Sequence, residues 1–384
     1  YMEKIRDFLQ QRESEGLLRK LRPASGRKNG NIYFDGREYI DLSSNDYLGL
    51  AGHPRLIAAG KRALDEFGAG SGASRLLSGD LSIHHKLEAA ISHFKNKEAS
   101  LIFNSGYQAN VGIFNSICNK DDCVFSDRLN HASIVDGLLL SRAKIFRFRH
   151  NDVNDLEDLL KRERQKFKKA LIVTETVFSM DGDMAPLDAL VDLKERYDCL
   201  MAVDEAHATG VYGTNGSGMA EKYNLSNRID IIMGTFGKAL GSFGAYVAAS
   251  KDIVEYLVNT CRSFIYSTGL PPAVIACNLA SLELGKEEPY RREELLRNAG
   301  LLRDALKNMG LKVIGSSQIV PVIVGENRAT QNLAKELQFK GWWALPLRPP
   351  TVPEGQARLR FSLTFNHDLN ILRRLVEDLS SVRI

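Results

Sequence analysis

Seven short apolar runs, separated by longer stretches of helical pattern, constrain the fold of this chain more than any other feature of its sequence. Several runs are rich in β-branched residues and are bounded by Gly, Asp or Asn, as strands commonly are. Strands that alternate with helices in this way predict a mostly parallel sheet covered by helices on both faces. The runs are 99–103, 123–125, 144–146, 170–173, 200–203, 229–233 and 244–248.

The chain after about residue 285 shows a second pattern. Helical stretches at 293–309, 330–340 and 370–382 alternate with two strand candidates, 319–324 and 357–363. This arrangement predicts a smaller α+β domain with its own core.

Residues 3–21 carry apolar side chains at helical spacing and predict an amphipathic helix outside the main body. The chain has 384 residues, beyond the size at which one hydrophobic core usually stops growing. We therefore predict an α/β fold in three segments. Residues 1–45 form an N-terminal helix and arm, 46–285 a large domain, and 286–384 a C-terminal α+β domain.

Charge argues against a nucleic-acid-binding protein. Lys and Arg number 51 and Asp and Glu 47, and the small surplus is not gathered into a long basic stripe. The densest basic stretch, 161–169, also contains Glu163 and has a helical pattern. A solvated helix face is its better interpretation, and a docking patch for an acidic partner the lesser one.

Other features indicate the compartment. The two longest uncharged stretches, 99–119 and 263–282, are broken by polar residues or prolines, so we expect no membrane span. The first residues lack the order of a secretion signal. The five cysteines show no C-x-x-C pair and no metal-ligand spacing. They indicate free thiols in a reducing cytosol, and we expect a soluble cytoplasmic protein without a metal site.

Polar residues that follow the apolar runs are the candidates for chemistry, because ligands of an open parallel sheet bind beyond the carboxyl ends of its strands. The most informative is Lys238, which lies between Gly237 and Gly241. Glycine lets backbone approach a ligand closely, and a partly desolvated lysine can form Schiff bases. Taken alone, Lys238 is better explained as a surface charge on a loop than as a catalytic residue.

Other strand ends supply the partners that a pyridoxal-phosphate (PLP) site needs. Asp204 could keep the pyridine nitrogen protonated, and the backbone around Gly106 and Tyr107 could bind the phosphate at a helix N-terminus. Each residue also has a plainer explanation, such as a helix cap, a turn or a loop histidine. Their combination in one chain favours a PLP enzyme with its cofactor on Lys238. The remaining candidates are Thr235 for the phosphate, His131 over the ring, and His207 and Ser179 near the phenolic oxygen.

The segments 43–50, 70–79, 204–207 and 235–238 resemble motifs of the α-oxoamine synthases, which are fold-type I PLP enzymes. The likeness runs over nearly the whole chain. It implies a large, mostly parallel sheet domain, a smaller C-terminal domain and a homodimer with sites at the subunit interface. It also implies the cofactor-site roles given above, with Lys238, His131 and Asp204 as the catalytic residues.

The resemblance further implies residues that bind the substrates. Arg360 and Asn45 would hold the amino-acid carboxylate, with Arg348 and Thr351 nearby. Arg19, on the early helix, would meet the distal carboxylate of a pimeloyl chain, although Lys20 or Arg22 could replace it. Thr268 could reach the phosphate of a neighbouring subunit.

Within that family the chain is most similar to the enzymes that act in biotin biosynthesis. The segments that carry this likeness are 150–153, 348–353 and 357–360. These condense L-alanine with pimeloyl-CoA or pimeloyl-acyl-carrier protein. The alternatives are sibling enzymes that use glycine or serine with another acyl-CoA. An aminotransferase and a non-catalytic partner subunit are weaker alternatives, and Lys238 argues against the second.

Overall fold

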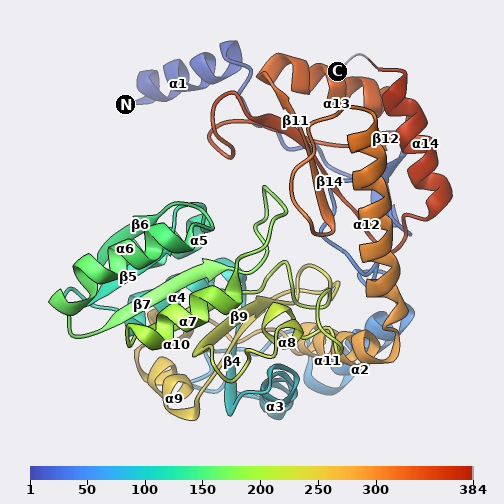
Figure 1. Ribbon diagram of the computed structural model, residues 1–384. Helices are drawn as coiled ribbons and strands as arrows, with labels where there is room; N and C mark the ends of the chain where they lie inside the picture. Colours follow the sequence, from blue (N-terminus) through green and yellow to red (C-terminus); the bar gives the residue numbers. More distant parts are fainter. Residues whose placement is uncertain (383–384) are drawn as a thin grey trace. The chain divides into compact units, whose positions relative to one another are not determined.

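Seven strands form one sheet, and they coincide with the seven apolar runs of the sequence (Figure 1). The computed structural model describes residues 1–382. The strands from β9 to β6 run parallel, whereas β10 is antiparallel to both of its neighbours, which confirms a mostly parallel sheet. In sheet order they are β4 (Ala99–Phe103), β10 (Ala245–Ala249), β9 (Ile231–Thr235), β8 (Leu200–Asp204), β7 (Ala170–Glu175), β5 (Cys123–Asp127) and β6 (Lys144–Phe148).

Both faces of this sheet are buried. All six residues of β7 and all five of β5 are buried, as expected for central parallel strands. Successive side chains point to opposite faces, so Leu101 and Phe103 join one hydrophobic cluster and Ile102 another. The helices of this part are α2 (Pro54–Phe67), α3 (Ser82–Lys95), α4 (Gly106–Ile117), α5 (Ala132–Ser141), α6 (Val153–Glu163), α7 (Leu187–Arg196), α8 (Met219–Lys222), α9 (Lys251–Thr260), α10 (Arg262–Ile265) and α11 (Pro272–Glu287), with a 3₁₀ turn at Arg164–Lys166.

The chain divides into two units. The large unit consists of Asp46–Ser179 and Met184–Glu293 and contains the seven-stranded sheet. The small unit consists of Tyr1–Asn45, Met180–Asp183 and the chain from Glu294 onward. Our division of the sequence at residues 45 and 285 stays a prediction.

The small unit contains two sheets. One has the order β1 (Gly26–Lys28), β2 (Asn31–Phe34), β3 (Arg37–Asp41) and β12 (Trp342–Trp343). The other has the order β11 (Ile319–Gly325), β14 (Ala357–Ser362) and β13 (Pro346–Leu347). Its helices are α1 (Met2–Ser14), α12 (Tyr290–Asn308), which begins in the large unit, α13 (Asn327–Phe339) and α14 (Leu369–Ser380).

The predicted helix over 3–21 is too long. Helix α1 (Met2–Ser14) ends before Gly16, whose φ of +66° is left-handed and breaks the helical path. None of its residues is buried. Within residues 1–382 every helix is too short or too polar to cross a lipid bilayer.

Candidate active site

A cavity of about 280 Å³ opens in the large unit at the carboxyl ends of the parallel strands. This is where an open parallel sheet binds its ligands. Of the nine residues predicted for the cofactor, seven line this cavity: Gly106, Tyr107, His131, Asp204, His207, Thr235 and Lys238. Strands β4, β5, β8 and β9 thus bring together side chains that lie far apart in the sequence.

Asp204 ends β8 and is buried. Its Oδ2 accepts a hydrogen bond from Nδ2 of Asn110 at 2.9 Å, and its Oδ1 accepts one from the backbone N–H of Ala206 at 2.8 Å. Hydrogen bonds of this kind stabilise a carboxylate in a buried site. Asn110 was missed by the sequence reasoning. It lies on α4 four residues after Gly106, and helical spacing puts both on one face of the helix.

His131 caps α5 and lies at the edge of the cavity. Its Nδ1 accepts a hydrogen bond from the backbone N–H of Ser133 at 3.3 Å, which leaves the proton of the neutral ring on Nε2. Burial of the ring lowers the pKa of His131; the charge of Lys238 lowers it further, and Asp204 and Asp136 oppose the shift. The ring is therefore neutral near pH 7.

His207 lies in the turn after β8, and its ring is fixed by a buried tyrosine. Oη of Tyr47 and Nδ1 of His207 are 2.7 Å apart. Tyr47 is fully buried. It belongs to the segment 43–50, which supported the family resemblance, so this segment also contributes a residue that orients the cavity wall.

Lys238 follows β9 in a tight turn and is half-buried. The backbone N–H of Gly241 donates to the carbonyl of Lys238 at 2.9 Å. Gly241 has a φ of +63°, and a Cβ there would collide with the backbone of Ala51. The glycine is therefore required by the conformation and by the space around the turn.

The N-terminus of α4 and the end of β9 form a polar cradle in the same cavity. Ser105 caps the helix, and its Oγ accepts a hydrogen bond from the backbone N–H of Gln108 at 3.2 Å. A Cβ on Gly106 would lie 2.8 Å from Cγ2 of Thr235. The hydroxyl of Thr235 is buried without a hydrogen-bond partner among the described residues. Open backbone N–H groups beside an unpaired hydroxyl suit a phosphate group.

Two predicted cofactor residues do not line this cavity. Ser179 is buried elsewhere in the large unit. Thr268 forms an isolated β-bridge with Ser74, and its carbonyl accepts a hydrogen bond from Nδ2 of Asn104 at 3.0 Å. Its proposed contact is with a second subunit, so it stays a prediction.

The predicted substrate residues all lie in the small unit. Nη2 of Arg360 donates to Oδ1 of Asn45 at 3.2 Å, so these two side chains lie together, and their contact with a substrate carboxylate stays a prediction. Arg19 Nη2 donates to Oγ1 of Thr351 at 3.0 Å. Arg19 is not on the early helix, since α1 ends at Ser14, and this part of the prediction is wrong.

Arg19, Thr351 and Arg348 line a cavity of about 730 Å³ within the small unit, together with Leu17 and Leu18. Burial lowers the pKa of Arg348, and the charge of Arg19 adds to this. The wall contains these two guanidinium groups and several leucines and prolines, together with Lys20 and Lys335, so it offers both cations and apolar surface to a ligand.

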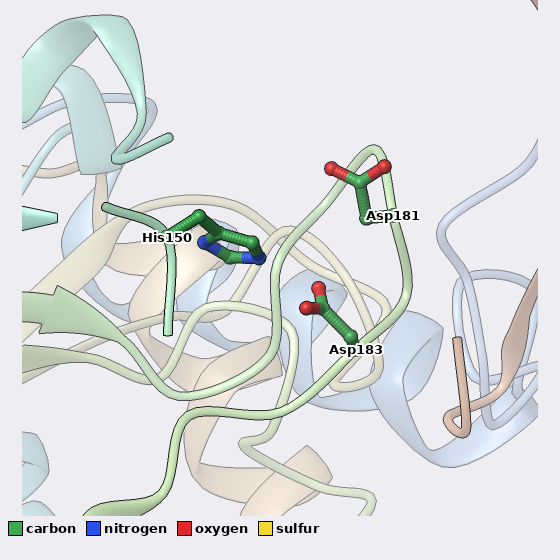
Figure 2. Close-up of side chains that lie close together, drawn as sticks. All are labelled: His150, Asp181 and Asp183. Atoms are coloured by element: carbon green, nitrogen blue, oxygen red, sulfur yellow. The ribbon is translucent and has the colours of Figure 1, made fainter. Parts of the chain in front are cut away.

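Figure 2 shows His150 with Asp181 and Asp183, two acids on the loop Met180–Asp183. Asp181 forms an ion pair with the buried Arg358, which also belongs to the small unit. His150 belongs to the large unit, where its Nδ1 lies 3.0 Å from Oδ1 of Asp127. Asp181 and His150 thus each have a partner within their own unit, and we assign no metal to this group of side chains.

Comparison with known proteins gives the family. The model of the family "aminotransferase class I and II" matches residues 37–379. The chain belongs to this family. Its relatives there include the 8-amino-7-oxononanoate synthases of Geobacter sulfurreducens, 50% identical over 97% of this chain and 96% of that protein, and of Geotalea daltonii, 48% identical over 99% and 98%.

Solved structures of related enzymes support the same fold and family. The serine palmitoyltransferase of Sphingomonas wittichii superposes with a TM-score of 0.93 at 33% identity, covering 98% of this chain and 96% of that one. A serine palmitoyltransferase from S. paucimobilis contains bound PLP and has a TM-score of 0.92 at 31% identity, covering 98% and 96%. The 8-amino-7-oxononanoate synthase of Francisella tularensis has a TM-score of 0.79 at 30% identity, covering 89% and 97%. The predicted fold class and family resemblance are confirmed.

Proposed function

We propose that this protein catalyses the PLP-dependent condensation of L-alanine with a pimeloyl thioester. The products are 8-amino-7-oxononanoate, CO2 and the free thiol, in biotin biosynthesis. One observation carries the proposal: Lys238, Asp204 and His131 line one cavity at the carboxyl ends of the sheet. The curated relatives that support the substrates share 46–50% of their residues with this chain and bear the name of that synthase, one of them as putative.

The residues of the cavity fit PLP. Asp204 would hold the pyridine nitrogen, and the cradle of Gly106, Tyr107 and Thr235 would bind the phosphate. Lys238 is the amine that would carry the cofactor. When bound, PLP supplies a cationic ring that stabilises negative charge on the carbon next to the substrate amine.

Two side chains would handle protons and charge. The amine of Lys238 would remove the α-proton of alanine and later return a proton to the product. The neutral ring of His131, with its proton on Nε2, would donate a hydrogen bond to the oxyanion that develops at the thioester carbonyl. Neither step needs a charged imidazole, in agreement with the lowered pKa of His131.

The small unit would bind the two substrate carboxylates. Arg360, next to Asn45, would hold the carboxylate of alanine until it leaves as CO2. Arg19 would bind the distal carboxylate of the pimeloyl chain, with Arg348 and Thr351 beside it. Planar guanidinium groups bind carboxylates through two parallel hydrogen bonds, which fixes orientation as well as charge.

We propose a homodimer as part of this function. Apolar side chains are strongly exposed on the large unit, including Leu77 at 80%, Leu139 at 60% and Tyr266 at 73%. Exposed apolar surface is a mark of protein interfaces. Thr268, two residues after Tyr266, would then reach the cofactor phosphate of the partner subunit. The five free thiols suit the reducing cytoplasm.

The experiment is a product assay. PLP-loaded protein is incubated with pimeloyl-CoA and equimolar alanine, glycine and serine, and the products are identified by mass. A dominant 8-amino-7-oxononanoate peak is expected. A glycine or serine product would move the protein to a sibling activity. If no product forms, the assay is repeated with the pimeloyl-acyl-carrier protein, and a second failure would overturn the proposed substrates.

A further inference from the structure

Glu175 is a second buried carboxyl group in the cavity, and the proposed function leaves it without a role. It is the last residue of β7 and lies directly opposite Asp204 of β8 in the parallel register. Residues paired in this way on neighbouring strands point to the same face of the sheet. Both line the cavity and both are buried, with exposed fractions of 4% and 7%.

Two buried carboxyl groups on adjacent strands do not both ionise readily, because like charges at close range repel. Asp204 holds the better position for the charge, since it accepts hydrogen bonds from Asn110 and from the backbone of Ala206. Glu175 is fully enclosed. Burial raises the pKa of Glu175 well above its usual value, and the charge of Asp204 raises it further.

Other groups also face Glu175. The charge of Lys238 and the backbone N–H of His131 lower its pKa, and Asp127 raises it. These opposing influences do not reverse the direction of the shift. The backbone N–H of His131 thus lies near enough to the carboxyl of Glu175 to affect its pKa, so the two groups are neighbours.

A hydrogen-bonded connection ties the loop that carries His131 to β7. The backbone N–H of Glu175 donates to Oδ1 of Asn130 at 3.1 Å, and Nδ2 of Asn130 donates to the carbonyl of Val173 at 2.9 Å. Asn130 directly precedes His131. The loop that carries His131 is therefore fixed to the backbone of β7 through the side chain of Asn130, beside the carboxyl of Glu175.

We propose that Glu175 is a positioning residue: its carboxyl group stays protonated, leaves the negative charge on Asp204, and holds the loop that places His131. This inference rests on the proposed function for the roles of Asp204 and His131. A protonated glutamate and a glutamine have the same shape and the same lack of charge, so Glu175→Gln should preserve the arrangement and Glu175→Ala should not.

The first measurement is PLP binding to the apoprotein, followed through the visible absorbance of the bound cofactor. Glu175→Ala should weaken binding roughly 5- to 100-fold, because it leaves buried polar groups unpaired, and it should alter the spectrum. Glu175→Gln should restore both properties. If Glu175→Gln binds as poorly as Glu175→Ala, the inference is wrong.

The second measurement follows urea unfolding of the apoprotein against pH. A carboxyl group whose pKa is raised on folding stabilises the protein fully below its unfolded pKa of about 4.5, and this contribution is lost as pH rises toward the folded pKa. Wild type should therefore lose stability relative to Glu175→Gln as pH rises above about 4.5. If the stability of wild type relative to Glu175→Gln stays constant or rises as pH increases, Glu175 is ionised in the folded protein and the inference is overturned.

The exposed Glu255 provides the control. Glu255→Gln removes one carboxyl group without touching the cavity and should follow wild type in both measurements. Neither measurement uses a substrate. A protein that makes no 8-amino-7-oxononanoate but passes both tests would refute the proposed substrates and leave the role of Glu175 standing.

Discussion

The side-chain amide of Asn110 donates a hydrogen bond to Oδ2 of Asp204 across 2.9 Å and another to Oγ of Ser133 across 3.0 Å. One amide thereby links α4, β8 and the first turn of α5. In the proposed function Asp204 binds the pyridine nitrogen of the cofactor, and the amide of Asn110 would hold its carboxyl group in the direction that this contact needs.

Removing this donor should weaken the cofactor site. We expect Asn110→Leu, which keeps the volume but not the hydrogen bonds, to reduce PLP affinity of the apoprotein by about 10-fold or more. Equilibrium titration of the apoprotein with PLP measures this. Asn154 lies exposed at the start of α6, and Asn154→Leu should bind PLP like wild type. Equal affinities for the two variants would contradict the role of Asn110.

Replacing Lys238 should remove both the attachment of the cofactor and the base. Lys238→Ala is expected to lose the visible absorbance of the lysine-bound cofactor and at least about 100-fold in turnover. The exposed Lys251 gives the control, and Lys251→Ala should retain both. Turnover near the wild-type rate in Lys238→Ala would refute the proposed chemistry.

A buried ion pair supports the turn that carries Asp204 and His207. Nζ of Lys95 lies 2.6 Å from Oε2 of Glu205, and both side chains are almost completely buried. Lys95→Met leaves Glu205 without its partner and should lower the free energy of unfolding by about 3–5 kcal/mol. The exposed pair Lys251–Glu255 is the comparison, and Lys251→Met should cost about 0–1 kcal/mol. Urea unfolding measures both, and equal costs would contradict this account.

The small unit should lose stability in mild acid because of His367. Burial lowers the pKa of His367 from 6.5 to about 4. Between these pH values the ring is protonated in the unfolded chain and neutral in the folded protein. The contribution of the neutral ring is complete above about pH 6.5 and disappears as pH falls toward 4, a loss on the order of 3 kcal/mol. Unfolding of His367→Asn should lack this part of the pH dependence, and identical pH profiles would exclude His367 as its source.

Much of the central sheet could be predicted because its strands are buried on both faces and appear as uninterrupted apolar runs. The first small sheet was missed although the signals are present. Asn29-Gly30 and Asp35-Gly36 have positive φ values and form the two-residue loops of two hairpins, and such dipeptides are the strongest short-range hairpin signal. Leu17 and Leu18 continued the helical spacing of α1, and a single glycine ended the helix before them.

Some residues of the candidate site could likewise be predicted from the sequence, and others could not. Residues that directly follow an apolar run, such as Asp204 and Lys238, could be found because topology alone brings them to the edge of the sheet. Ser133 could not, because it lies within a helix and faces the cavity only through the packing of α5, whereas the helical spacing of Asn110 from Gly106 was a signal that we did not use. Glu175 ends an apolar run as Asp204 does, and only the strand register shows that the two are neighbours.

Because β3 pairs with β12, the first sheet of the small unit cannot be completed until residue 343 has been synthesised. Ile40 lies opposite Trp342 in the sheet of the small unit, and the strands of the large unit are complete by Ala249. Ser43 and Trp343, which share a hydrogen bond, are 300 residues apart, which at ribosomal speed corresponds to roughly 15–60 s. For that time the apolar residues Ile32 and Phe34 lack the neighbour Trp343, with which they later share a core. The first strands of the small unit thus wait with part of their apolar surface uncovered until nearly the whole chain has been synthesised.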